Sequence, residues 1–138
     1  MSISDSDALV LFGATGDLAF KMIFPALYSM TKRGTLTVPV VGVALPQWCM
    51  PELHERVLDS IKHSGGVDDQ PALDRLLSLI SYVSGDYKDP ATFTAIRAAL
   101  GTARRPAHYL AIPPSLFETV IEALGTSKLA DNARVIVE

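Results

Sequence analysis

The chain has 138 residues, of which 49% are hydrophobic and 20% charged, and its formal net charge is −3. This length suits one domain with a single core, and the composition is typical of a globular protein rather than a disordered or repetitive chain. No apolar run reaches the roughly 18 residues that span a bilayer, and the polar start is unlike a secretory signal. With an acidic balance and one cysteine, Cys49, we expect a cytoplasmic protein without disulfides, membrane contacts or nucleic-acid partners.

Short apolar runs that predict strands alternate with longer segments of helical periodicity. The first strand is predicted at 9–12, and a helix from about Asp17 to Gly34 follows it, with a kink at Pro25. Further strands are predicted at 38–43, 81–84, 108–112 and 134–137. Between the first two of these lie a helix from Pro51 to about Ser64 and a helix at 71–79. Asp89 and Pro90 begin a helix that ends at Gly101, and a last helix begins after Pro114, where Ser115 and Glu118 have capping-box spacing. This alternation predicts an α/β fold with a parallel sheet and crossover helices.

A glycine turn after the first strand carries the strongest functional signal. Gly13 and Gly16 follow the apolar run directly and lead into a helix. Residues without a Cβ let the backbone turn sharply and approach a ligand, and free N–H groups at a helix start attract an anion. The G-x-x-G spacing alone fits an ordinary tight turn equally well. The strand before it and the helix after it favour a dinucleotide site.

A family resemblance rests on five segments in chain order, which are GATGDLAFKMIFPALYSM, VVGVA, YVSGDY, YLAIPPSLF and RVIVE. They resemble the coenzyme domain of the glucose-6-phosphate dehydrogenase family, over nearly the whole chain. The resemblance implies an NAD(P)-dependent oxidoreductase that oxidises glucose 6-phosphate in the pentose phosphate pathway. In the family, Lys-Pro-Phe-Gly and a second domain with the catalytic histidine come next. We therefore expect residues 1–138 to be a Rossmann-type domain, with a doubly wound sheet of order 3-2-1-4-5 in three α/β/α layers. We expect a fragment that lacks the catalytic residues and is inactive alone.

The resemblance also implies a set of coenzyme-binding residues. The turn that holds the pyrophosphate and the nearby ribose is matched by Gly13, Ala14, Thr15, Gly16, Asp17 and Leu18. The adenosine half is matched by Asp86 and Tyr87, the nicotinamide half by Ala111, Ile112 and Pro113, and a positioning glutamate by Glu138. Simpler interpretations stay open, with Asp17 as a favourable charge at a helix start, Tyr87 as loop packing and Pro113 as the end of a strand.

Two departures from the family pattern concern binding. After the second strand, many members have an arginine for the 2′-phosphate of NADP, where this chain has Leu45. No acidic residue stands there to favour NAD, so we predict a weak or relaxed choice between NADP and NAD. The second departure is Met22, where the family commonly has a lysine that reaches the sugar phosphate. We expect Met22 to face the core, and Lys21, about 100° away around the helix, does not inherit the role without a shift of register.

Two other functions are compatible with the sequence. A non-catalytic nucleotide-binding sensor or scaffold would share the glycine turn, and short-chain dehydrogenases or epimerases also begin with a strand and Gly-Ala-Thr-Gly. Tyr28 and Lys32 even have the Tyr-x-x-x-Lys spacing of that class, but they lie in the first helix, far from its usual place. Cys49, His54 and His63 lack a recognised zinc spacing, so no metal is predicted. The oligomeric state stays open, and glucose 6-phosphate is expected as a partner only of a full-length parent.

Overall fold

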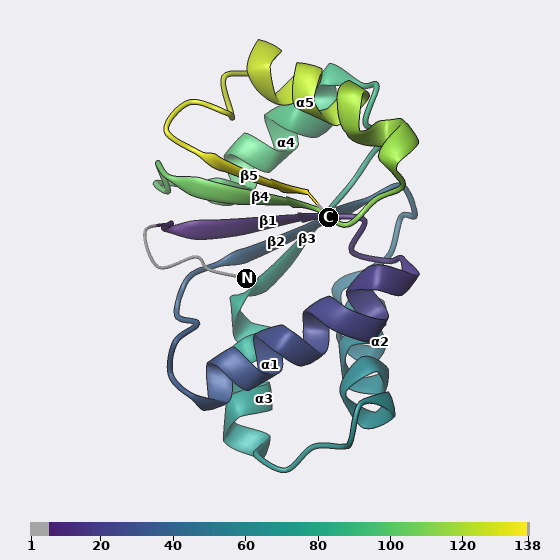
Figure 1. The fold of residues 1–138 in the computed structure, drawn as a ribbon. Helices are drawn as coiled ribbons and strands as arrows, with labels where there is room; N and C mark the ends of the chain where they lie inside the picture. Colours follow the sequence, from purple (N-terminus) through teal and green to yellow (C-terminus); the bar gives the residue numbers. More distant parts are fainter. Residues whose placement is uncertain (1–5, 138) are drawn as a thin grey trace.

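The computed structural model describes residues 6–137, which form a parallel sheet between two layers of helices (Figure 1). The strands of this part of the chain are β1 (Ala8–Phe12), β2 (Val40–Ala44), β3 (Ile80–Ser84), β4 (Pro106–Leu110) and β5 (Arg134–Val137). Their order in the sheet is β3-β2-β1-β4-β5, and each pair of neighbours is parallel. The predicted α/β fold and the predicted order 3-2-1-4-5 are confirmed.

Helices cover both faces of the sheet, as Figure 1 shows. One face is covered by α1 (Phe24–Lys32), α2 (Met50–His63) and α3 (Gln70–Leu79), and the other by α4 (Pro90–Leu100) and α5 (Phe117–Thr126). A π-helix, η1 (Ala19–Ile23), leads into α1, and a 3-10 turn, η2 (Pro114–Leu116), leads into α5. The expected three layers are therefore present.

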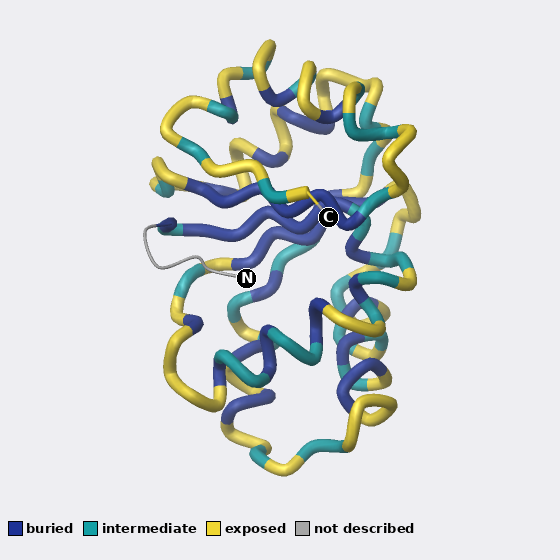
Figure 2. Tube along the Cα trace, viewed as in Figure 1, coloured by how far each residue is buried: buried dark blue, intermediate teal, exposed yellow. Residues whose placement is uncertain are grey.

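Strand β1 lies at the centre of the sheet and explains its continuous apolar run. All five of its residues are fully buried (Figure 2). Leu9 and Leu11 pack with the cluster under α1, α2 and α3, whereas Val10 and Phe12 pack with the cluster under α4 and α5. Successive strand residues point to opposite faces, so a strand covered on both sides must be apolar throughout. Each of the Leu, Val and Phe side chains of β1 contributes about 1.5–3 kcal/mol on burial.

The helix after the glycine turn differs from expectation. It begins as a π-helix, in which the N–H of Phe24 donates to the carbonyl of Ala19 five residues earlier. This wider turn changes the register, so Ala19 and Ile23 are buried while Met22 is 61% exposed. The prediction that Met22 faces the core was wrong. Pro25 takes the second position of α1, where its missing N–H is tolerated.

Two caps were predicted, and one of them is present. The side chain of Asp89 accepts a hydrogen bond from the amide of Ala91 and begins α4 as expected. The predicted capping box of Ser115 and Glu118 is absent from α5, whose N-cap residue Leu116 makes no side-chain bond. The 3-10 turn η2 intervenes, with the amide of Leu116 donating to Pro113. It moves the α-helical start past Ser115.

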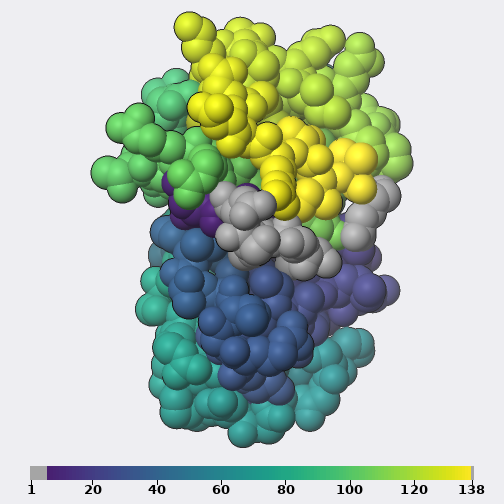
Figure 3. Space-filling model, turned by 60° about the vertical axis from the view of Figure 1, so that its left-hand side comes forward, coloured from purple at the N-terminus to yellow at the C-terminus, as the bar shows by residue number. Residues whose placement is uncertain are grey.

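Strand β5 forms an outer edge of the sheet and is the most exposed strand described. Val135 and Val137 are 40% and 49% exposed, and the yellow C-terminal residues lie on the surface in Figure 3.

Among residues 6–137, no helix is long and apolar enough to cross a membrane.

Candidate coenzyme site

Predicted site residues from four separate segments come together at one edge of the sheet. Residues 13–18 follow β1, Leu45 follows β2, residues 86–87 lie shortly after β3, and residues 111–113 follow β4. In a parallel sheet these carboxyl ends share an edge, and β2 and β4 lie on opposite sides of β1. The strand order therefore reverses at the glycine turn, which is where open α/β sheets bind ligands. Glu138 lies outside the described residues.

The first residues of the turn are tied to the neighbouring strands. The amides of Gly13 and Ala14 donate to the carbonyl of Val43 at 2.8 and 3.2 Å, and the amide of Ala111 donates to that of Phe12 at 3.0 Å. Gly13 has a φ of +85°, and a Cβ at this position would overlap the carbonyl oxygen of Ala111. The fold alone therefore requires glycine at position 13.

The last residues of the turn leave several amides without an acceptor. The amide of Gly16 donates to Gly13 at 3.0 Å and closes the turn. The N–H groups of Thr15, Asp17 and Leu18 donate to no acceptor in the described part of the chain. They lie at the start of the helix, where the backbone dipole also attracts negative charge. A Cβ added at Gly16 would meet only the Gly13 carbonyl, at 3.4 Å, so the protein itself leaves room over this residue.

Arg56 of α2 contacts the turn and was not predicted from the sequence. Its Nη2 donates to the carbonyls of Thr15 and Gly16 at 3.2 and 3.5 Å, and its guanidinium lies 4.3 Å from the centre of the Phe20 ring. Arg56 lies in α2, an amphipathic helix about forty residues after the turn. No local motif marked it, because only the fold brings the two segments together.

The aspartate and tyrosine after β3 face different surroundings. Asp86 is exposed, and its carboxylate accepts from the amide of Lys88. Tyr87 turns inward, with its ring edge on Phe12 and its hydroxyl donating to Val43 at 3.3 Å. Burial raises the pKa of Tyr87 to about 12, although the nearby Gly13 amide acts in the opposite direction. Its contacts therefore support the turn from beneath, as the packing interpretation of this residue expects.

The loop after β2 presents an apolar side chain at the position where the sequence resemblance implies an arginine. Leu45 is 68% exposed. The hydroxyl of Tyr82 donates to the carbonyl of Pro46 and holds the loop against β3. The Leu45 side chain has no group that could bind a phosphate.

Tyr28 and Lys32 have the spacing of a catalytic pair but serve the fold. The hydroxyl of Tyr28 donates to the carboxylate of Asp68 at 2.7 Å and accepts from the amides of Asp68 and Asp69 at 3.1 and 2.9 Å. Lys32 pairs with the same carboxylate at 3.0 Å and lies over the Tyr28 ring. These contacts join α1 to the loop before α3. Tyr28 is only 4% exposed, so in this structure the two side chains make structural contacts and do not line an open site.

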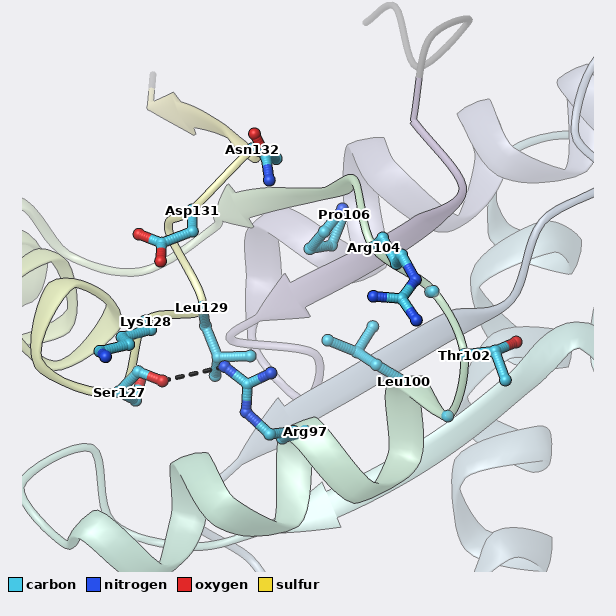
Figure 4. A pocket seen from close by; sticks show the side chains of 12 residues that line it. Arg97, Leu100, Thr102, Arg104, Pro106, Ser127, Lys128, Leu129, Asp131 and Asn132 are labelled. Atoms are coloured by element: carbon cyan, nitrogen blue, oxygen red, sulfur yellow. Dashed lines mark hydrogen bonds between the residues drawn. The ribbon is translucent and has the colours of Figure 1, made fainter.

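A cavity of about 620 Å³ lies at the opposite, amino edge of the sheet (Figure 4). It is lined by the C-terminal ends of α4 and α5, and the guanidinium of Arg97 donates to the carbonyl of Ser127 there at 2.9 Å. Arg104 and Lys128 also line it. Cations suit helix C-termini, where the backbone dipole is negative. None of the predicted coenzyme residues that the structure describes lines this cavity. Among residues 6–137, no group of three or more His, Cys, Asp or Glu side chains could hold a metal ion.

The sheet order, the glycine turn at its switch point and the free amides at a helix start define a Rossmann-type dinucleotide-binding domain. Residues 10–138 match the family model described as glucose-6-phosphate dehydrogenase, NAD binding domain. The chain belongs to the glucose-6-phosphate dehydrogenase family, a family of oxidoreductases, through its NAD-binding domain. The resemblance predicted from the sequence is confirmed, and the cofactor class is a nicotinamide dinucleotide.

Individual relatives agree with this assignment. Glucose-6-phosphate 1-dehydrogenase 1 of Mycobacterium bovis is 40% identical over 133 residues, which are 96% of this chain and 28% of that protein. The solved glucose-6-phosphate 1-dehydrogenase of Mycobacterium avium matches with a TM-score of 0.90 and 41% identity, over 96% of this chain and 29% of that one. The chain thus spans less than a third of these relatives. A short-chain dehydrogenase/reductase from Veillonella parvula matches with a TM-score of 0.50 at 14% identity, over 96% of this chain and 46% of that one, which shows the fold alone.

Proposed function

We propose that the chain binds NAD or NADP with the coenzyme pyrophosphate over residues 13–18. The observation that carries this proposal is that the N–H groups of Thr15, Asp17 and Leu18, at and just before a helix start, have no acceptor within residues 6–137. A hydrogen bond to a charged acceptor contributes about 1.5–3 kcal/mol, so these amides supply a substantial share of the binding energy. The open space over Gly16 suits a bulky anion.

We assign roles to the other predicted residues from their positions along the carboxyl edge of the sheet. Asp86 and Tyr87 border the adenosine half, with the hydroxyl of Tyr87 donating to the Val43 carbonyl beside the turn. Ala111, Ile112 and Pro113 border the nicotinamide half, because they follow β4 on the other side of the turn. Glu138 is proposed to position the coenzyme. Leu45 offers no charge to a 2′-phosphate, so we propose less than a tenfold preference between NADP and NAD.

In a protein of the relatives' length, this domain would be the coenzyme-binding domain of a glucose-6-phosphate dehydrogenase. Bound nicotinamide would accept a hydride from C1 of glucose 6-phosphate. The residues of this chain would bind the coenzyme and orient its nicotinamide, and the general base would come from outside residues 1–138. The chain alone is therefore proposed to bind coenzyme without turning over glucose 6-phosphate.

Calorimetric titration of the purified chain with NAD and NADP tests the binding proposal. We expect one site for each coenzyme, with dissociation constants within tenfold of each other. Absence of binding by both would overturn the proposed function, and NADP bound at least tenfold tighter than NAD would overturn the relaxed choice. A spectrophotometric assay with glucose 6-phosphate is expected to show no reduction of either coenzyme, and measurable turnover would contradict the inactive-chain proposal.

A further inference from the structure

The guanidinium of Arg56 lies against the carbonyl side of the glycine turn. Its Nη2 contacts the oxygens of Thr15 and Gly16, and its flat face lies 4.3 Å from the ring centre of Phe20. Its Nε is buried without a partner among the described residues. Leaving a buried charged donor unpaired costs free energy, so the contacts of Nη2 with the turn and of the guanidinium with the Phe20 ring must hold the side chain in this place.

The carbonyls that Arg56 contacts belong to the peptide groups that carry the turn's donors. A peptide group is planar, with its N–H and C=O pointing in opposite directions. The Thr15 carbonyl shares its peptide group with the amide of Gly16, and the Gly16 carbonyl shares its own with the amide of Asp17. The Asp17 amide is one of the three free donors, and the Gly16 amide closes the turn. The Gly16 carbonyl also accepts from the amide of Phe20 at 3.1 Å, so Arg56 and this helical bond together hold that peptide group, while Arg56 holds the one between Thr15 and Gly16 from its carbonyl side.

We propose that Arg56 is a positioning residue that holds the closed turn at Gly16 and so orients the Asp17 amide toward the coenzyme pyrophosphate. This inference rests on the proposed function and adds a residue from a different helix to the site. Arg56 lies on the carbonyl side, opposite to the proposed anion, so it acts through the turn and does not touch the phosphate. Because NAD and NADP share the pyrophosphate, its effect on their affinities is the same.

The attachment of α2 does not depend on Arg56. Leu53, Val57 and Ile61 of this helix are at most 1% exposed and pack in the cluster beneath it. The hydroxyl of Ser60, which is fully buried, donates to the carbonyl of Phe20 and ties α2 to the π-helix. Arg56→Met keeps a long apolar side chain beside Phe20 and removes only the charge and the donors. This variant is therefore expected to fold.

The test compares Arg56→Met and Arg56→Lys with the matched control Arg75→Met. Arg75 is exposed on α3, so its replacement removes the same charge away from the turn. Calorimetry measures the affinities for NAD and NADP, and amide hydrogen exchange by NMR measures the protection of Gly16 and Asp17 without ligand. We expect Arg56→Met to weaken both coenzymes about tenfold and equally, because the Asp17 amide is held less firmly toward the shared pyrophosphate. Exchange at the Gly16 amide should become faster in Arg56→Met. Arg56→Lys, which keeps a cation, should lose less coenzyme affinity and less protection of Gly16 than Arg56→Met does. Arg75→Met should change neither the affinities nor the exchange.

Each remaining outcome separates the two proposals. Unchanged exchange at Gly16 and unchanged affinities in a folded Arg56→Met protein overturn the positioning role. A loss confined to NADP also overturns it, since that would place the guanidinium on the 2′-phosphate. If the unchanged chain binds neither coenzyme but exchange at Gly16 still depends on Arg56, the proposed function fails while the orientation of the turn by Arg56 stands.

Discussion

The two glycines of the turn are required for different reasons, and alanine substitutions should separate them. Gly13 has a φ of +85° and no room for a Cβ beside Ala111. Gly13→Ala is expected to lower the free energy of unfolding by about 2–5 kcal/mol, through left-handed strain and overpacking. At Gly16 the protein leaves room for the methyl group, so Gly16→Ala should change stability by less than about 1 kcal/mol. The same methyl group enters the space proposed for the pyrophosphate and should weaken coenzyme binding by at least about tenfold.

Urea unfolding and calorimetric titration of both variants measure these effects. The two proteins serve as controls for each other, since one is expected to lose stability and the other affinity. A Gly16→Ala protein that binds NAD as tightly as the unchanged chain would count against the proposed place of the pyrophosphate. A Gly13→Ala protein of unchanged stability would show that the turn relaxes around the added carbon.

Leu45 allows a direct test of coenzyme choice. Its side chain is 68% exposed at the end of β2 and contributes no charge. Leu45→Arg adds a bidentate donor to this loop, and we expect NADP to bind about ten- to a hundredfold tighter while NAD changes little. Leu45→Gln is the polar control without a charge. Titration with both coenzymes measures the ratio, and an equal gain for NAD and NADP would mean that the arginine does not reach the 2′-phosphate.

Single residues of the turn could be predicted because they are consecutive in the chain. Gly13 to Leu18 form a local motif, and the strand before them is apolar throughout. Arg56 could not be predicted, because its relation to the turn exists only after α2 packs on the π-helix. Met22 was placed in the core because an ordinary helical period was assumed, and a five-residue turn is not visible in the sequence pattern.

At the scale of elements, the order of the helices and strands followed from the sequence, and two of the boundaries that differ from the prediction involve proline. The second strand begins at Val40 rather than at 38, because Pro39 lies immediately before it and cannot donate to a neighbour. The fourth strand begins at Pro106 rather than at 108, since proline is tolerated as the first residue of a strand. Apolar runs predicted the strands but not where pairing begins, which depends on the neighbouring strand.

The junction between α1 and the loop before α3 depends on one hydroxyl. Tyr28→Phe removes a donor to Asp68 and leaves the amides of Asp68 and Asp69 without their acceptor. We expect the free energy of unfolding to fall by about 1–3 kcal/mol, with no change in coenzyme affinity. Lys32→Met removes the solvent-accessible ion pair with Asp68 and the ammonium over the Tyr28 ring and should cost less than about 1 kcal/mol. Chemical denaturation compares the two variants, and a loss of coenzyme binding in Tyr28→Phe would contradict its purely structural role.

For the molecule as a whole, a buried histidine links the sheet to the segment before its outer strand. His108 lies in β4, is fully buried and contacts the ring of Phe12. Its Nε2 is 2.8 Å from the carbonyl of Leu129. Because a carbonyl only accepts, Nε2 carries the hydrogen, and Nδ1 has no partner in the described chain. A second proton on this ring would be a buried, uncompensated charge.

This histidine makes the stability of the fold depend on pH. Burial lowers the pKa of His108 below its ordinary value of 6.5, although the Leu129 carbonyl acts in the opposite direction. The unfolded chain therefore takes up the proton first, so stability is complete above pH 6.5 and falls as the pH drops from there toward the folded pKa. One group contributes at most about 1.4 kcal/mol per pH unit. The hydrogen bond from Tyr28 lowers the pKa of Asp68 below 3.8, so its contribution is lost only at more acidic pH.

Urea unfolding between pH 7.5 and pH 5 is expected to show a falling free energy of unfolding for the unchanged chain. His108→Gln keeps an N–H donor for Leu129 but cannot take up a proton, so its stability should be nearly constant over this range. His63→Gln, which alters an exposed side chain at the end of α2, should behave like the unchanged chain. The same decline in all three proteins would show that another group governs acid stability, whereas a decline absent only from His108→Gln assigns it to the contact between β4 and the segment before β5.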